Sequence, residues 1–319
     1  MPLDTHTGVK IVEQRSTNTM IKLDTELDMA KIDLEPKPVL LDSGCRRSST
    51  VALRYRAIER AILTMRERFM DPLTLPEIAD EAQLSPFHFN RVFRSMIGIP
   101  PSVFLAALRM EEAKKLLLTT QRSVTDICFD VGYTSLGTFT SRFGLFVGLP
   151  PSRFRLLAQE EIMHSCPQDL RGHLDRIQLC QNTHPGACIT GYICASFPFD
   201  GLIFVGMFSD PLPQGQPVGC TILMAPGQYR IPPVPDGQYY LFATAIDQSQ
   251  DFLTVLAHGT SLHGGLGRPP VTVQNGRAKE SIDMSLIPTS WADPPIVVAF
   301  PWLLMSRFLQ HVSVIAEAR

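Results

Sequence analysis

The sequence lacks the patterns that mark several classes of protein. Its seven cysteines are odd in number and irregularly spaced, and no Cys-x-x-Cys pair occurs, which argues against a disulfide scaffold or a paired-thiol metal site. No stretch approaches the ~20 apolar residues of a membrane span, and no basic-then-apolar start resembles a signal peptide. We therefore expect reduced thiols and a cytoplasmic protein without membrane contact.

Catalytic motifs are missing as well. The sequence has no Gly-x-Ser-x-Gly turn, no phosphate-binding loop and no pair of carboxylates suited to acid–base work. Histidines and cysteines recur between residues 164 and 188, but their spacings match no compact zinc site. The sequence predicts no catalytic residue, no metal and no cofactor.

Charge is distributed unevenly along the chain. The net charge is only -2, but the balance is -1 over residues 1–50, +4 over 51–158 and -5 over 159–319. A basic segment between acidic ones is typical of a nucleic-acid-binding region within a larger protein. The hydrophobic fraction of 45% allows at least one sizeable core to be buried.

Residues 1–50 are polar and without periodicity, and we interpret them as a mobile tail. Helical periodicity begins near Val51, with Asp71-Pro72 ending the first helix. Beyond it lies an internal repeat, in which seven identities share an offset of 50 residues. They are Phe89/Phe139, Phe93/Phe143, Gly98/Gly148, Pro100/Pro150, Pro101/Pro151, Ser102/Ser152 and Phe104/Phe154.

Each copy of the repeat predicts a short helix (75–82 and 124–131), a turn and a second helix. Ser85 and Ser135 are good N-caps for the second helices, and Gly132 suits a left-handed helix end. The paired phenylalanines are four residues apart, so they share a buried face and leave their neighbours exposed. This is a helix-turn-helix arrangement, whose second helix can enter a major groove.

A longer helix over residues 102–118 joins the two copies and spans roughly 25 Å. Two second helices held about that far apart could reach successive major grooves, which lie ~34 Å apart. The resemblance to a known family follows from three stretches of sequence. They are Ala106-Ala107-Leu108-Arg109-Met110-Glu111-Glu112-Ala113-Lys114-Lys115-Leu116-Leu117, Asp126-Ile127-Cys128-Phe129-Asp130-Val131-Gly132-Tyr133 and Gly148-Leu149-Pro150-Pro151-Ser152-Arg153-Phe154-Arg155.

These stretches resemble the DNA-binding domain of AraC/XylS-type regulators, over about 100 of the 319 residues. The resemblance implies that both second helices contact DNA. The first copy keeps the family pattern as Phe89-Asn90-Arg91-Val92-Phe93-Arg94. The second copy departs from it, because Ser141 and Gly144 stand where basic residues are usual. We therefore expect a weaker contact from the second copy.

Side-chain chemistry suggests individual contacts within the two second helices. Arg91 suits guanine, Asn90 suits adenine, and Phe87 or Thr138 suits a thymine methyl group. The predicted DNA-binding set is Ser85, Phe87, His88, Asn90, Arg91, Arg94, Ser135, Leu136, Gly137, Thr138, Thr140, Ser141 and Arg142.

The C-terminal third alternates short apolar runs with Pro/Gly turns, which predicts seven strands of an antiparallel β-sandwich over 187–290. The stretch 226–243 resembles the transthyretin-like or carboxypeptidase-regulatory-like sandwich. Residues 258–265 are interpreted as a loop, 159–186 as a linker, and 291–319 as a C-terminal helical segment containing an amphipathic helix over 302–318. The predicted strands are Ile189–Ala195, Leu202–Phe208, Thr221–Met224, Tyr229–Ile231, Gln238–Ile246, Val271–Val273 and Ser281–Leu286.

The predicted fold is thus multidomain α + β: an all-α tandem helix-turn-helix domain (51–158) followed by an antiparallel β-sandwich that senses a signal or drives assembly. The predicted function is sequence-specific transcription regulation on double-stranded DNA. Two alternatives stay open: a DNA-repair or other enzyme fused to an AraC-like segment, and a carbohydrate-binding interaction module. DNA-repair methyl-transfer proteins of this kind carry Pro-Cys-His-Arg, which this sequence lacks. RNA polymerase, a small-molecule effector and a second copy of the chain stay open as partners.

Overall fold

The computed structural model describes residues 45–157, 188–247, 252–259, 262–266 and 268–299. The predicted tail up to residue 44, the linker and the helix over 302–318 lie outside these residues. Arg46–Arg319 forms one of two compact units of the chain, and every contact discussed below lies within it. Among the described residues, no single helix has the length and apolar character of a membrane span. The bent pair formed by the third and fourth helices meets that test on length and composition alone.

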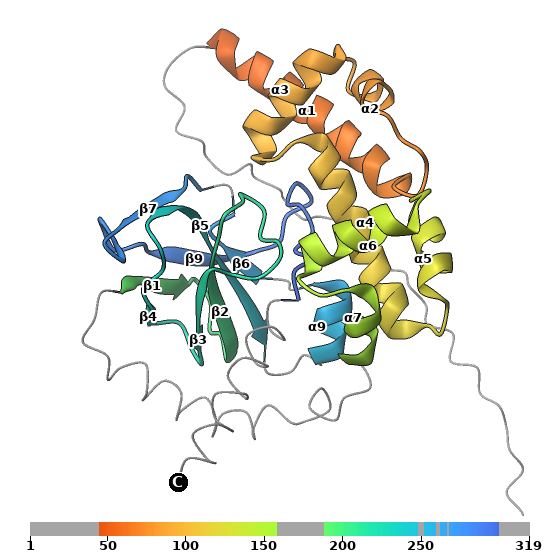
Figure 1. Cartoon of the computed structure of the whole chain (residues 1–319). Coiled ribbons are helices and arrows are strands. Elements are labelled where there is room, and N and C mark those ends of the chain that lie inside the picture. The colour runs from red at the N-terminus through yellow and green to blue at the C-terminus, as the bar shows by residue number, and fades with distance from the viewer. Residues whose placement is uncertain (1–44, 158–187, 248–251, 260–261, 267, 300–319) are drawn as a thin grey trace, which may run out of the picture. The chain divides into compact units, whose positions relative to one another are not determined.

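The N-terminal part of the described chain is helical (Figure 1). The first helix ends at Glu67, four residues before Asp71-Pro72, where it was expected to end, and its buried face carries Ile58, Ile62 and Met65. The short helices of the two copies start where the repeat predicted. The helices are α1 (Cys45–Glu67), α2 (Leu75–Glu81), α3 (Pro86–Ile97), α4 (Pro101–Thr119), α5 (Val124–Asp130), α6 (Leu136–Val147) and α7 (Pro151–Leu157).

Helix α4 is the connector that was expected between the two copies. Its 19 residues correspond to a length of ~28 Å at 1.5 Å per residue. Buried residues lie on several sides of it, including Phe104, Met110 and Lys114. A helix that is buried nearly all round packs against neighbours on more than one face. Helix α4 contacts other helices of the N-terminal part and also helix α9 (Phe252–His258), which follows strand β5 (Gly237–Asp247).

The C-terminal part is built from strands, which join in the order β3-β2-β5-β6-β9-β1-β4. Strand β7 pairs with β5 and β8 outside this path. The path closes on itself in part, because β3 and β4, at its two ends, contact each other. The strands are β1 (Ile189–Ala195), β2 (Gly201–Phe208), β3 (Gly219–Leu223), β4 (Gln228–Ile231), β5 (Gly237–Asp247), β6 (Leu262–Gly264), β7 (Val271–Gln274), β8 (Arg277–Ala278) and β9 (Met284–Pro288).

Two details correct the predicted sandwich. Strand β1 pairs with β9 in parallel, with Ile193 beside Met284, so the sheet is mixed and not wholly antiparallel. A parallel pair needs a long connection, and the chain between β1 and β9 supplies it. The stretch 258–265, expected to be a loop, contains strand β6. There His263 is 1% exposed and its Nε2 lies 2.9 Å from Asp293 Oδ2.

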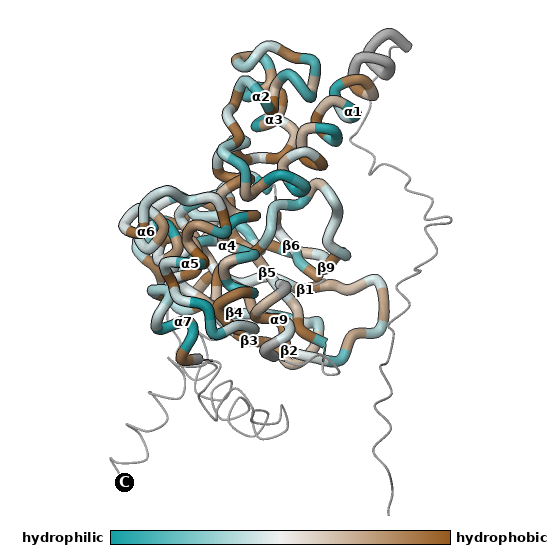
Figure 2. Tube along the Cα trace, turned by 90° about the vertical axis from the view of Figure 1, so that its right-hand side faces the viewer, coloured by the Kyte–Doolittle hydropathy of each residue, from teal (hydrophilic) through white to brown (hydrophobic). Residues whose placement is uncertain are grey.

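Strands β2 and β5 are buried on both faces. Ile203 and Val205 face a core that lies within the β-rich part, whereas Phe204 and Phe208 belong to a second core. That second core also contains Phe146 and the apolar residues of α1 to α7. Hydrophobic stretches occur in helices and strands alike (Figure 2). The β-rich part therefore shares a continuous apolar core with the helices.

Backbone and side-chain bonds reinforce this shared core. The backbone N–H of Ala299 donates to Val147 O at 3.0 Å, and that of Gly215 donates to Phe146 O at 3.2 Å. Arg66 of α1 donates to the carbonyl oxygens of Trp291 and Asp293, each at 3.2 Å. The β-rich part thus contacts α1, α4 and α6. These contacts include one helix that precedes α4 in the chain, α1, and one that follows it, α6.

Candidate DNA interface

Helix α3 is held by one buried aromatic face. Phe89 and Phe93 are fully buried, with ring centroids 5.5 Å apart, and Phe93 meets Phe104 of α4 edge-on at 5.7 Å. Gly98 ends the helix at φ 88°, a left-handed conformation that glycine adopts without strain. Ser85 occupies the N-cap position as predicted, but its side chain makes no capping bond. Burial of the phenylalanines therefore fixes the face that α3 presents.

Helix α6 repeats this construction. Phe139 and Phe143 are fully buried with centroids 5.8 Å apart, and Phe143 meets Phe154 of α7 at 5.6 Å. Gly148 ends the helix at φ 88°. Here the N-cap prediction is confirmed, because Ser135 Oγ accepts the backbone N–H of Thr138 at 3.4 Å. Equivalent pairs of aromatic rings thus orient the second helix of each copy.

The predicted DNA-binding residues lie on the opposite, outward faces. In α3 and its N-cap, His88 is half-buried and the other predicted residues are exposed; the side chain of Phe87 is 83% exposed. Arg91 Nη2 lies 3.5 Å from His88 Nδ1, so these two side chains sit on the same side of the helix. All seven predicted residues of the second copy are exposed: Ser135, Leu136, Gly137, Thr138, Thr140, Ser141 and Arg142.

The turns of the two copies share one backbone geometry. Gln83 has φ 55° and Gly132 has φ 81°, each just after the end of its short helix. The N–H of Leu84 donates to Ala79 O, and the N–H of Tyr133 donates to Cys128 O, both at 3.0 Å. The first turn therefore holds a glutamine in the conformation that the second turn gives to glycine. Sequence identity alone did not reveal this match.

Both short helices begin with a capping box, which the sequence analysis missed. Thr74 and Glu77 bond reciprocally at the start of α2, as do Ser123 and Asp126 at the start of α5. The bonds from Thr74 hold the pKa of Glu77 below its ordinary value, and the hydroxyl of Ser123 does the same for Asp126. The pattern Ser/Thr-x-x-Glu/Asp before an apolar run was the available signal.

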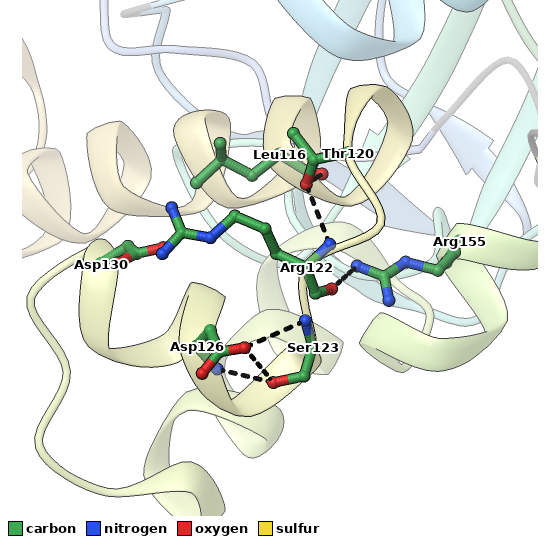
Figure 3. A network of polar contacts seen from close by, with 7 residues as sticks. All are labelled: Leu116, Thr120, Arg122, Ser123, Asp126, Asp130 and Arg155. Carbon is green, nitrogen blue, oxygen red and sulfur yellow. Dashed lines mark hydrogen bonds and ion pairs between the residues drawn. The ribbon is translucent and has the colours of Figure 1, made fainter.

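An arginine network orders the loop before α5 (Figure 3). Arg155 of α7 donates to the carbonyl oxygens of Leu117 and Arg122, and the side chain of Arg122 pairs with Asp130. Thr120 Oγ1 donates to Leu116 O at 2.7 Å at the end of α4. The second copy is thereby attached to the end of the connector helix.

The basic residues of the two outward faces differ. Arg91 and Arg94 are exposed on α3, whereas the matching positions of α6 hold Ser141 and Gly144. A Cβ added at Gly144 would have no atom within 4 Å, so nothing in the fold requires glycine there. Arg142 is exposed on α6, and its positive charge lowers the pKa of Arg109, after the larger effect of burial. The asymmetry of charge expected from the sequence is thus present on the surface.

Comparisons with known proteins agree with this geometry. The family model of a helix-turn-helix domain matches residues 78–156. The HTH-type transcriptional activator AarP of Providencia stuartii is 36% identical over 84 residues, which are 26% of this chain and 62% of that protein. The bifunctional transcriptional activator/DNA repair enzyme AdaA of Bacillus subtilis is 33% identical over 95 residues, 30% of this chain and 45% of that protein.

A solved structure is also similar, that of a regulator from Chromobacterium violaceum described as carrying an AraC-type DNA-binding domain. It is 25% identical and covers 34% of this chain and 96% of its own, with a TM-score of 0.32. The chain spans less than two thirds of either curated relative, and the residues that the family model matches lie within its helical part. Residues 78–156 of this chain form a helix-turn-helix domain that is similar to those of AraC-type regulators.

Proposed function

We propose that the chain is a sequence-specific transcription regulator whose helices α3 and α6 enter adjacent major grooves of double-stranded DNA. One observation carries the proposal. Two helices of a repeat bury matching phenylalanine pairs and expose, on matching faces, side chains of the kinds that contact bases and phosphates in DNA-binding proteins. Both curated relatives described above are named transcriptional activators, which supports this function.

In this proposal Arg91 is the main base-reading residue and Arg94 is a phosphate contact. Arginine contacts guanine through two hydrogen bonds, and the exposed position of Arg91 on α3 leaves its guanidinium free to do so. The exposed ring of Phe87 supplies an apolar contact for a thymine methyl group. The residues of α6 contribute shape and hydroxyl contacts with less positive charge.

The β-rich part is proposed as a sensing or assembly domain. Its support is the core that it shares with the helices, together with its bonds to Phe146, Val147 and Arg66. A ligand or a second copy that displaced this part would disturb the helices too. Coupling between two such sites is typically about 1–3 kcal/mol.

We infer regulation without catalysis, and two facts support this. One relative carries a DNA-repair activity in its name, but the match to it covers 30% of this chain. The thiol of Cys128 is buried and burial raises its pKa, whereas reactive thiols have a lowered pKa.

A gel shift with genomic DNA fragments tests the function, followed by Arg91→Ala on the fragment that binds most tightly. The variant should lose about 1–3 kcal/mol of binding and relax the preference at one base pair. The matched control is Arg60→Ala, which removes the same charge from an exposed site on α1. Equal effects of the two variants, or no shifted fragment for the wild-type chain, would overturn the proposal.

A further inference from the structure

One arginine of the connector helix touches both copies of the repeat. Arg109 lies on α4, between the first unit (α2 and α3) and the second unit (α5 and α6). Its Nε donates to Phe69 O at 2.7 Å, and its Nη2 donates to Asp71 O, also at 2.7 Å. Both carbonyls belong to the loop that leads into α2. Arg109 therefore fixes the position of the loop that precedes the first unit.

The same guanidinium also contacts the second unit. Its Cζ lies 5.5 Å from the centroid of the Tyr133 ring, within the range of a cation–π contact. Tyr133 stands in the turn between α5 and α6, and its ring meets Phe139 of α6 edge-on at 5.7 Å. One side chain thus joins the loop before α2 to the aromatic core beneath α6.

The backbones of the two units meet directly beside this arginine. A Cβ built on Gly132 would lie 2.4 Å from Met70 O and 3.0 Å from Met70 C. Gly132 also has φ +81°, where a side chain is strained. The loop before α2 therefore packs against the turn of the second unit at a point where only glycine fits.

The loop before α2 is also held by bonds within itself. Arg68 Nε pairs with Asp71 Oδ2 at 2.9 Å, and the N–H of Leu73 donates to Asp71 O at 2.7 Å. The capping box at Thr74 follows at once and starts α2. A shift of the loop would therefore move α2, and with it α3.

We propose that Arg109 and Gly132 form a joint that sets the spacing of the two DNA half-sites which the chain accepts. The proposal rests on the proposed function, in which α3 and α6 read adjacent grooves. Rotation of one unit against the other would break the glycine contact and, depending on which unit α4 follows, either the two bonds to the loop or the ring contact. Arg109 is a positioning residue in this arrangement, because its side chain bonds to protein groups of both units.

Arg155 supplies a matched control. It also donates to two backbone carbonyls before a short helix, those of Leu117 and Arg122 before α5. These two bonds lie at the end of α4 and in the loop before α5, within the second unit. Loss of Arg155 should weaken the fold as loss of Arg109 does, while leaving the joint between the units in place.

The experiment measures binding of the full chain to duplexes that carry both half-sites with the spacer lengthened or shortened by one base pair. The half-sites come from a selection of bound sequences. The wild-type chain should prefer its own spacer by ~10-fold or more, since two linked contacts gain affinity only when both fit. Arg109→Met should reduce that preference to within ~3-fold, while binding to a single half-site stays near the wild-type value.

Gly132→Ala provides a second variant of the joint, and Gly227→Ala is its control, because a Cβ at Gly227 meets nothing nearer than 3.9 Å. The change at Gly132 should also flatten or move the spacer preference, and the change at Gly227 should not. Equal effects of Arg109→Met and Arg155→Met on the preference, or a preference unchanged in both joint variants, would overturn the joint alone. A wild-type chain that selects no DNA would overturn the proposed function with it.

Discussion

Replacement of the buried lysine of the connector helix should stabilise the protein. Lys114 of α4 is 2% exposed, and burial lowers the pKa of its ammonium from 10.5 to about 8, while the nearby Glu111 opposes this shift. The step from 10.5 to about 8 corresponds to about 3 kcal/mol, at ~1.36 kcal/mol per pH unit. Relaxation of the fold reduces this cost, so about 3 kcal/mol is the largest gain that Lys114→Met should give at pH 7.

The gain should depend on pH in a defined direction. Below pH 8 both the folded and unfolded chains carry the charge, and the folded chain bears the full cost. Between pH 8 and 10.5 the folded chain releases the proton while the unfolded chain keeps it, so the free energy of unfolding rises with pH. The advantage of Lys114→Met over wild type should therefore shrink across this window and vanish above it.

Urea unfolding of the full chain at pH 7 and pH 10, followed by circular dichroism, measures this effect. Lys115→Met is the control, because Lys115 pairs with Glu112 at 3.5 Å and its side chain is 44% exposed. That change should alter the free energy of unfolding by no more than ~0.5 kcal/mol. The reasoning fails if Lys114→Met stabilises no more than Lys115→Met, or if its advantage is the same at both pH values.

Three further outcomes follow from the structure. Ser123→Ala removes the capping box of α5 and should cost ~1 kcal/mol at pH 7 in thermal unfolding. Because the bonds from Ser123 lower the pKa of Asp126 in the fold, part of this cost should fade as the pH drops through that lowered pKa, and a cost that stays constant throughout an acid titration would contradict it. Arg94→Ala should reduce the salt slope of DNA binding by ~0.9, and more than Arg142→Ala does; a larger drop for Arg142→Ala would refute the asymmetry. Residues 51–158 expressed alone should melt at a lower temperature than the full chain, because α4 and α6 lose apolar cover; equal melting temperatures would refute the shared core.

The repeat made much of the helical part predictable. Glycine and proline punctuation placed the ends of α3 and α6, and the spacing of phenylalanines placed their buried faces. The equivalence of Gln83 and Gly132 could not be read from the residues, because a glutamine in a left-handed conformation leaves no signature. The capping boxes could have been predicted, since the sequence contains the Ser/Thr-x-x-Glu/Asp pattern at the start of both short helices.

Contacts distant in sequence explain most of what was missed. Leu202–Phe208 and Leu241–Ile246 are nearly continuous apolar runs, and such runs indicate strands covered on both faces. They were assigned to a sandwich, whereas their second faces pack into the core of the helices. The burial of Lys114 was likewise not predicted, because a lysine is usually exposed and the residues around it in the sequence do not indicate otherwise. The direction of β1 against β9 depends on the path between them, which local patterns do not specify.

The most direct test of the central claim is a selection of sequences bound by the full chain from a pool of random duplex DNA. Because α3 and α6 are exposed on two units joined by one helix, the selected sites should contain two half-sites about 10–10.5 base pairs apart from centre to centre. The half-site lost in Arg91→Ala should be the more strongly selected of the two. A pool that shows no enrichment, or enrichment of a single short site that Arg91→Ala still selects, would contradict the account.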